Sequence, residues 1–122
     1  MIAPSWRKEV TLKLQGPGRR IRIYIGESDQ WQGKCLYMAI VQEARKYGLA
    51  GATVARGIMG FGAHSVVHET RLFSLSQDRP VVVEIVDTEE KIRSFIPVLD
   101  AMIHEGMITT SEVEIVTYRA SQ

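Results

Sequence analysis

The pattern of apolar and polar residues predicts two strands near the start of the chain. Within Arg20–Ile25 three isoleucines alternate with polar or aromatic residues, which is the period of two expected of a half-buried strand. A weaker alternation over Lys8–Leu14 runs into Gly16-Pro17-Gly18. Glycine and proline together favour turns, so a short strand that ends in a turn is predicted there.

Two later segments have the spacing of amphipathic helices. Residues 34–47 place their apolar side chains on one helical stripe, and Gly48 follows as a residue that tolerates the left-handed conformation past a helix end. A second stripe runs from Ile92 to Ile103 and is predicted to end at Gly106, with Pro97 inside it. Asp87 or Thr88 is expected to cap this second helix.

Three further segments have the pattern of strands: 53–59, 80–86 and 112–118. The resulting order is strand, helix, strand, strand, helix, strand, which is typical of an α+β, ferredoxin-like βαββαβ fold. Such a fold has an antiparallel sheet with two helices on one face, and its other face meets solvent or another chain. Because strand 80–86 is apolar on both faces, we expect another chain there and hence an assembly.

Length and charge narrow the classes of function. The chain has 122 residues, 45% of them hydrophobic, and a formal net charge of +1. This length suits one domain, and the near-neutral charge offers no general attraction to nucleic acid. No signal peptide or membrane-spanning run is evident, so we expect no direct membrane insertion. The single cysteine, Cys35, fits a reducing compartment, and a cytoplasmic location is expected.

Two stretches of the sequence, Arg22–Gly62 and Pro80–Ile92, resemble the uncharacterised DUF190 family, a branch of the P-II-like signalling proteins. The resemblance implies a ferredoxin-like domain over residues 19–119 with a long loop at 61–78, between an N-terminal extension (1–18) that can hold a short strand and a tail (120–122). It also implies a homotrimer whose clefts bind a small effector, usually an adenine nucleotide. The loop, called the T-loop, is flexible in these proteins and contacts a regulated transporter, channel or enzyme.

The glycine-rich base of this loop is the first candidate ligand site. Its residues are Gly57, Gly60, Phe61, Gly62 and Ala63, with His64 entering the loop. Glycine allows a backbone to approach a ligand closely and leaves N–H groups available to phosphate. The alternative interpretation of the same glycines is a tight turn.

Few positive charges lie near the glycine-rich start of this loop in the sequence. P-II-like proteins hold phosphates with a basic loop, and this chain has Glu105–Glu112 in its place. A triphosphate normally needs charge-assisted bonds, so ATP is less well suited than a monophosphate, a cyclic nucleotide or another small anion. Candidate cations are Arg56, Lys34 and Arg119. Glu27 and Ser28, in the loop 26–33, could line the site, or Ser28 could simply cap the following helix.

Other chemistries have weaker signals. His64 and His68 are four residues apart, as in some metal sites, but no third ligand is evident and no metal is expected. The sequence holds no G-x-S-x-G motif and no dinucleotide fingerprint, so a sensor without a required cofactor is expected, not an enzyme. Two alternatives stay open: a ligand-independent interaction module for a membrane transporter or channel, and an enzyme that uses Glu27, Asp29 and His64.

Overall fold

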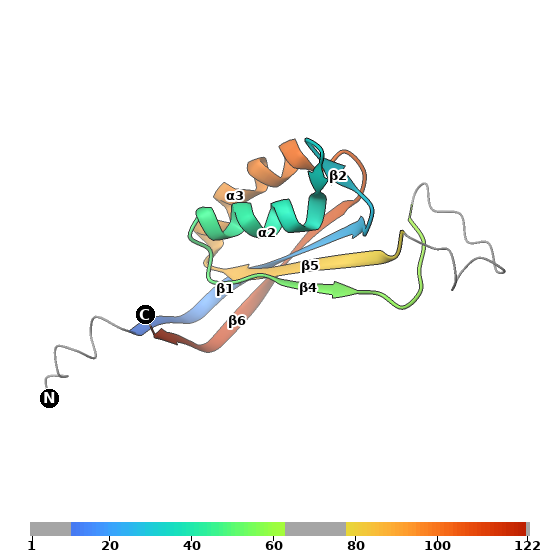
Figure 1. Cartoon of the computed structure of the whole chain (residues 1–122). Coiled ribbons are helices and arrows are strands. Elements are labelled where there is room, and N and C mark those ends of the chain that lie inside the picture. Colours follow the sequence, from blue (N-terminus) through green and yellow to red (C-terminus); the bar gives the residue numbers. More distant parts are fainter. Residues whose placement is uncertain (1–10, 63–77, 122) are drawn as a thin grey trace, which may run out of the picture.

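The computed structural model describes residues 11–62 and 78–121. They form a four-stranded antiparallel sheet with two helices on one face (Figure 1). The sheet contains β1 (Thr11–Gly26), β4 (Thr53–Arg56), β5 (Pro80–Asp87) and β6 (Met107–Ser121), in the order β4-β5-β1-β6. The helices are α2 (Leu36–Lys46) and α3 (Glu89–Met102). The predicted α+β, ferredoxin-like fold is therefore confirmed.

The hydrophobic core lies between this sheet and the two helices. Ile21, Ile23 and Ile25 of β1 are buried beside Val81, Val83 and Ile85 of β5, as the alternation predicts. The helices cover them with a second set of buried residues: Leu36, Ala39, Ile40, Ala44, Ile92, Phe95, Leu99 and Met102. The ring of Phe95 also lies 5.2 Å from that of Tyr47, centroid to centroid, which joins α3 to the end of α2.

The predicted helix boundaries follow local chemistry. Thr88 is the N-cap of α3, and its hydroxyl accepts a hydrogen bond of 3.3 Å from the backbone N–H of Lys91. Pro97 lies inside α3, as predicted. Gly48 follows α2 with a φ of +82°, a backbone conformation that residues other than glycine rarely adopt.

The region around Gly16-Pro17-Gly18 differs from the prediction. No turn forms there: β1 runs as one strand from Thr11 to Gly26 and pairs with β6 from Thr11 to Tyr24. A register shift between Leu14 and Gly16 marks a β-bulge, and Gly18 lets β6 approach because a Cβ there would lie 2.7 Å from Ile115 Cδ1. The long strand β6 supplies hydrogen bonds to this part of β1, and the glycines and proline of the segment do not by themselves predict that pairing.

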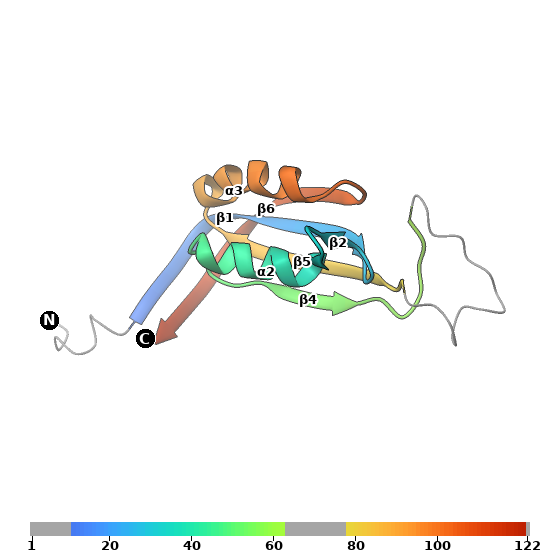
Figure 2. The same ribbon diagram turned by 45° about the horizontal axis from the view of Figure 1, so that its top comes forward.

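Beyond the bulge, β1 and β6 continue as a two-stranded ribbon, residues 11–16 and 115–121, that leaves the main sheet (Figures 1 and 2). Within β1, only Arg19–Gly26 pairs with β5, so the described part of the ribbon has no third strand. The strand at 53–59 is shorter than predicted and ends at Arg56, whereas the last strand is longer and spans Met107–Ser121. A short hairpin, β2 (Gln30–Trp31) and β3 (Lys34–Cys35), lies between β1 and α2.

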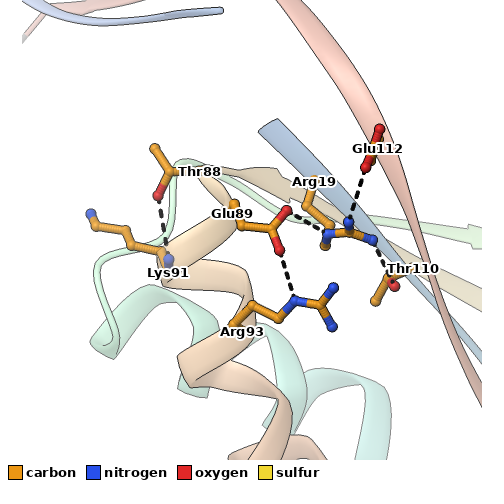
Figure 3. A network of polar contacts seen from close by, with 7 residues as sticks. All are labelled: Arg19, Thr88, Glu89, Lys91, Arg93, Thr110 and Glu112. Carbon is orange, nitrogen blue, oxygen red and sulfur yellow. Dashed lines mark hydrogen bonds and ion pairs between the residues drawn. The ribbon is translucent and has the colours of Figure 1, made fainter. Parts of the chain in front are cut away.

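An ion-pair network fixes the first turn of α3 to the sheet (Figure 3). Arg19 Nε lies 2.8 Å from Glu89 Oε1, and the second Glu89 oxygen lies 2.8 Å from Arg93 Nε. The guanidinium of Arg19 also donates to Thr110 Oγ1 at 3.1 Å, so it links α3 to both β1 and β6. The hydrogen bond from Arg19, with that from Arg93, lowers the pKa of Glu89 from its usual value.

Some predictions concern residues outside the described ranges. They include the start of the first predicted strand (residues 8–10), most of the loop 61–78, and the candidates Ala63, His64 and His68. Within the described ranges, neither helix is long and apolar enough to cross a bilayer.

Candidate functional site

The face of the sheet opposite the helices is open. Arg20, Arg22 and Tyr24 alternate with the buried isoleucines of β1, so they point away from the helices. Pro80, Val82, Glu84 and Val86 of β5 point the same way and are half-buried. Arg22 Nε lies 2.9 Å from Glu84 Oε2 near the middle of this open face, and this bond raises the pKa of Arg22.

A hollow of about 570 Å³ lies at the end of the open face nearest the glycines. We call it the loop-end hollow. Tyr24, Val82, Met107 and Thr109 line it from the open face, and Gly60, Phe61 and Gly62 line it from the segment after β4. The other lining residues are Ile25, Gly26, Asp29, Asp78, Pro80, Val81, Glu105 and Gly106.

Hydrogen bonds hold together the two chain segments that flank the predicted loop. The N–H of Gly57 donates to the carbonyl of Pro80 at 2.7 Å, which joins the end of β4 to the start of β5. The N–H of Glu27 donates to the carbonyl of Arg79 at 2.8 Å. The Ser28 hydroxyl and backbone N–H both donate to Asp78 Oδ1, at 2.9 and 3.3 Å, so three hydrogen bonds join the loop after β1 to the segment that leads into β5.

Charged and polar side chains cluster beside these segments. Arg56, at the end of β4, is ion-paired with Glu27, so its charge is already partly neutralised within the chain. Tyr37, near the start of α2, lies close to both residues and to Cys35. A hydrogen bond with Cys35 is the main cause that raises the pKa of Tyr37, and the charge of Glu27 adds to it.

The loop-end hollow is acidic. Its lining includes the carboxyl groups of Asp29, Asp78 and Glu105, and no lysine or arginine is among the described residues that line it. Asp29 Oδ2 accepts a hydrogen bond of 2.9 Å from the N–H of Gly26, and Asp78 lies against the same glycine. Two carboxyl groups are therefore held beside one short stretch of backbone.

A second hollow of about 520 Å³ occupies the other end of the open face, under the ribbon. We call it the ribbon-end hollow. Apolar lining comes from Leu14, Val86, Val113 and Ile115, and polar lining from Arg20, Thr53, Glu84 and Tyr118. Ala50, Gly51, Ala52, Glu114, Val116 and Thr117 complete it. The Tyr118 hydroxyl donates to the carbonyl of Ala50 at 2.9 Å, which ties the ribbon to the segment before β4.

Arg20 is the notable side chain of the ribbon-end hollow. Its Nε is buried and has no hydrogen-bond partner. No hydrogen bond or ion pair found among the described residues includes the side chain of Arg20, in contrast to the side chains of Arg19 and Arg22 on the same strand. Buried polar groups are nearly always paired in folded proteins, so this one calls for a physical explanation.

Comparison with known sequences assigns the family. The model of DUF190, described as "Uncharacterized ACR, COG1993", matches residues 18–115. This chain belongs to the DUF190 family. A UPF0166 protein of Aquifex aeolicus (strain VF5) is 40% identical over 96 residues, which are 79% of this chain and 90% of the relative.

Solved structures similar to this DUF190 chain have the PII-like fold. A PII-like signaling protein from Thermus thermophilus has a TM-score of 0.60 at 17% identity, covering 83% of this chain and 91% of its own. CPII from Thiomonas intermedia K12, bound to ADP, AMP and acetate, has a TM-score of 0.53 at 14% identity, covering 84% and 91%. These likenesses show the fold of the DUF190 chain.

Three predicted ligand residues line the loop-end hollow of this DUF190 chain: Gly60, Phe61 and Gly62. The N–H of Gly57 is used within the chain, Arg56 and Glu27 are paired with each other, and Ser28 binds Asp78. Lys34 and Arg119 line neither hollow. Among the residues the structure describes, no three His, Cys, Asp or Glu side chains gather as a metal site would require.

Sequence reasoning about this DUF190 chain missed Asp78 and Arg20. Asp78 lies 50 residues from Ser28, and no local pattern reports so distant a contact. Arg20 carried a signal, since it belongs to a basic face of the first strand, but the lack of a partner is visible only in three dimensions.

Proposed function

We propose that this protein is a PII-like signalling protein. It assembles as a homotrimer and binds a small, adenine-nucleotide-like effector in clefts between subunits. The loop between β4 and β5 acts as the T-loop, which passes the bound state on to a transporter, channel or enzyme. Effector binding shifts the population of loop conformations, and only a conformation that the partner prefers can carry information.

The loop-end hollow is the observation that carries this proposal. It lies where the chain enters and leaves the loop, and Gly60, Phe61 and Gly62 line it. A ligand there would contact the loop directly. We assign Ala63 and His64 to the same site as continuing residues, with Gly57, Arg56, Glu27 and Ser28 supporting its geometry. Lys34 and Arg119 are assigned to the neighbouring subunit's contribution.

The open face supports the assembly. Its apolar side chains include Val82 and Val86, half-buried within one chain, and Tyr24 and Met107, which are exposed. Such a face is costly in water and gains free energy when another chain covers it. The two hollows lie at opposite ends of this face, and we propose that the loop-end hollow of one copy lies against the ribbon-end hollow of the next.

Nucleotide-bound neighbours support the ligand class. CPII, which shares the fold, binds ADP and AMP. The apolar and aromatic lining of the loop-end hollow suits a planar base, because Phe61 and Tyr24 offer ring surfaces. The acidic side chains in the same hollow disfavour a triphosphate there.

Thermal unfolding of the full chain with adenosine, AMP, ADP and ATP tests the proposal, with light scattering to measure the assembled mass. A ligand at about 100 times its dissociation constant stabilises the fold by about 2.7 kcal/mol, which raises the melting temperature by several degrees. Phe61→Ala should lose this shift, because Phe61 lines the hollow and is 77% exposed, so its removal leaves the core intact.

Ile58→Ala is the matched control, since Ile58 is 96% exposed on the same segment and lines neither hollow. It should keep the shift. If no nucleotide changes the melting temperature of a trimer, the ligand-independent interaction module replaces this proposal. A monomer would contradict the assembly.

A further inference from the structure

The two hollows differ in charge, and the difference concerns where an effector's anionic group binds. Three carboxyl groups line the loop-end hollow, and none of its described lining residues is basic. A phosphate placed there would meet like charge at short range. The glycine-rich segment is therefore a poor position for the anion, although it remains open to an uncharged base.

The ribbon-end hollow has one basic residue in its described lining, Arg20. Arg20 points into it from the open face, and the apolar stem of its side chain lies beside apolar lining such as Val86. Two glutamates line the same hollow: Glu84 is paired with Arg22 at 2.9 Å, and Glu114 is exposed to solvent. Arg20 is thus a cation without a partner among the described residues.

A buried guanidinium nitrogen without an acceptor is costly, because its hydrogen bonds to water are lost and nothing replaces them. The cost disappears when an anion enters the hollow. Guanidinium has a fixed fork of donors that matches phosphate and carboxylate oxygens, and such charge-assisted bonds are stronger than neutral ones. The hydroxyl of Thr53 lies in the same lining and is a further polar group for this anion, whereas the Tyr118 hydroxyl already donates to Ala50.

We propose that the ribbon-end hollow binds the anionic group of the effector, with Arg20 as its principal ligand. This inference rests on the proposed function. In the proposed assembly the base of the effector occupies the loop-end hollow of one copy, and its single phosphate or carboxylate group reaches Arg20 of the next. The site then prefers a ligand with one anionic group to a triphosphate.

Adenosine and AMP are the probes, because they differ only in the phosphate. Titration calorimetry on the full-length protein should show that AMP binds about tenfold to a hundredfold more tightly than adenosine. Arg20→Met should abolish this preference while adenosine affinity stays the same. Arg20→Lys should keep part of it, because the charge remains and the fork of donors is lost.

Two controls locate the effect. Arg93→Met removes a guanidinium on α3 that is paired with Glu89 and lines neither hollow, so the AMP preference should persist. Asp78→Asn removes one negative charge from the loop-end hollow and keeps an oxygen for Ser28. Contacts with the base affect both probes alike, so the preference for AMP over adenosine should stay within about twofold of wild type if the phosphate lies at Arg20.

The outcomes separate this inference from its premise. If Arg20→Met keeps the AMP preference and Asp78→Asn raises it, the phosphate lies in the loop-end hollow and the inference is wrong, while the proposed function stands. If Arg20→Met instead breaks the assembly in light scattering, Arg20 pairs with a neighbouring copy and the inference is also wrong. If wild-type protein binds neither probe, the proposed effector class fails and the inference fails with it.

Discussion

Asp87 Oδ2 accepts a hydrogen bond of 2.8 Å from the backbone N–H of Ala50. The carboxyl group lies at the end of β5 and is only 1% exposed, yet it fixes the segment that connects α2 to β4. The same segment is held by Lys91 Nζ, which donates to the carbonyl of Gly48 at 3.0 Å, and by Tyr118 at Ala50. One wall of the ribbon-end hollow is thus fixed from three elements.

Replacing Asp87 should destabilise the fold. Asp87→Ala removes the acceptor for the Ala50 N–H and should lower the free energy of unfolding by about 2 kcal/mol. Asp87→Asn keeps one of the two oxygens that accept from the N–H groups of Ala50 and Thr88, so it should lose less. Urea denaturation of both variants measures the difference. Equal losses would show that packing around Asp87, and not this hydrogen bond, is what matters.

Glu89 predicts how stability depends on pH. Its pKa is lowered in the folded chain by Arg19 and Arg93, so its ion pairs stabilise the fold above the unfolded pKa. This stabilisation is lost as the pH falls through the lowered folded pKa. Glu89→Gln should therefore melt at a lower temperature than wild type at about pH 7, and the gap should close as the pH falls below the ordinary pKa range of a glutamate. Glu90→Gln, in the same turn, is the matched control and should keep the wild-type melting temperature, because no ion pair among the described residues includes Glu90.

Gly106 predicts a backbone constraint next to the loop-end hollow. Its φ is +138°, and a Cβ there would lie 2.6 Å from the carbonyl oxygen of Tyr24. Gly106→Ala should cost about 2 kcal/mol or more, measured by denaturation. Gly51→Ala is the matched control, because a Cβ at Gly51 meets no atom within 4 Å. A similar loss in both variants would contradict the steric argument.

The open face predicts the effect of a buried charge on assembly. Val82→Glu places a carboxyl group on the face that we propose to be covered by another copy, so light scattering should show smaller species. Met38→Glu adds the same charge on α2, where Met38 is 53% exposed, and should leave the mass unchanged. An unchanged mass for Val82→Glu would place the subunit contact elsewhere.

Local patterns predict most of the fold. The alternation of isoleucines, the helical stripes and the cap at Thr88 are properties of neighbouring residues, and both predicted helices and the strands of the ferredoxin-like order are present, although no turn separates residues 11–14 from the rest of β1. The bulge at Leu14 and Gly16 resembles a turn in sequence, because glycine and proline favour both and only pairing with β6 decides between them. Strand β6 begins earlier than predicted for the same reason: Thr109, Thr110 and Ser111 show no alternation, and β1 supplies their partners.

The candidate site is less predictable. The glycines at the base of the loop are identifiable by their spacing, and three of the predicted residues line one hollow. The charge of that hollow cannot be predicted from the sequence, because Asp29, Asp78 and Glu105 come from three separate segments. Charge at a site depends on residues that the fold brings together, and Arg56 illustrates this, since its pairing with Glu27 removes it as a free cation.

The ribbon of β1 and β6 also determines how the molecule responds to force. The register brings Thr11 opposite Ser121, so the two described ends of the chain lie side by side (Figure 1). Tension applied between these ends pulls the ribbon in unzipping geometry. The backbone hydrogen bonds then break one pair at a time, and many pairs are not sheared together. The ribbon should therefore peel apart at low force from its free end, before the helices and the rest of the sheet bear any load.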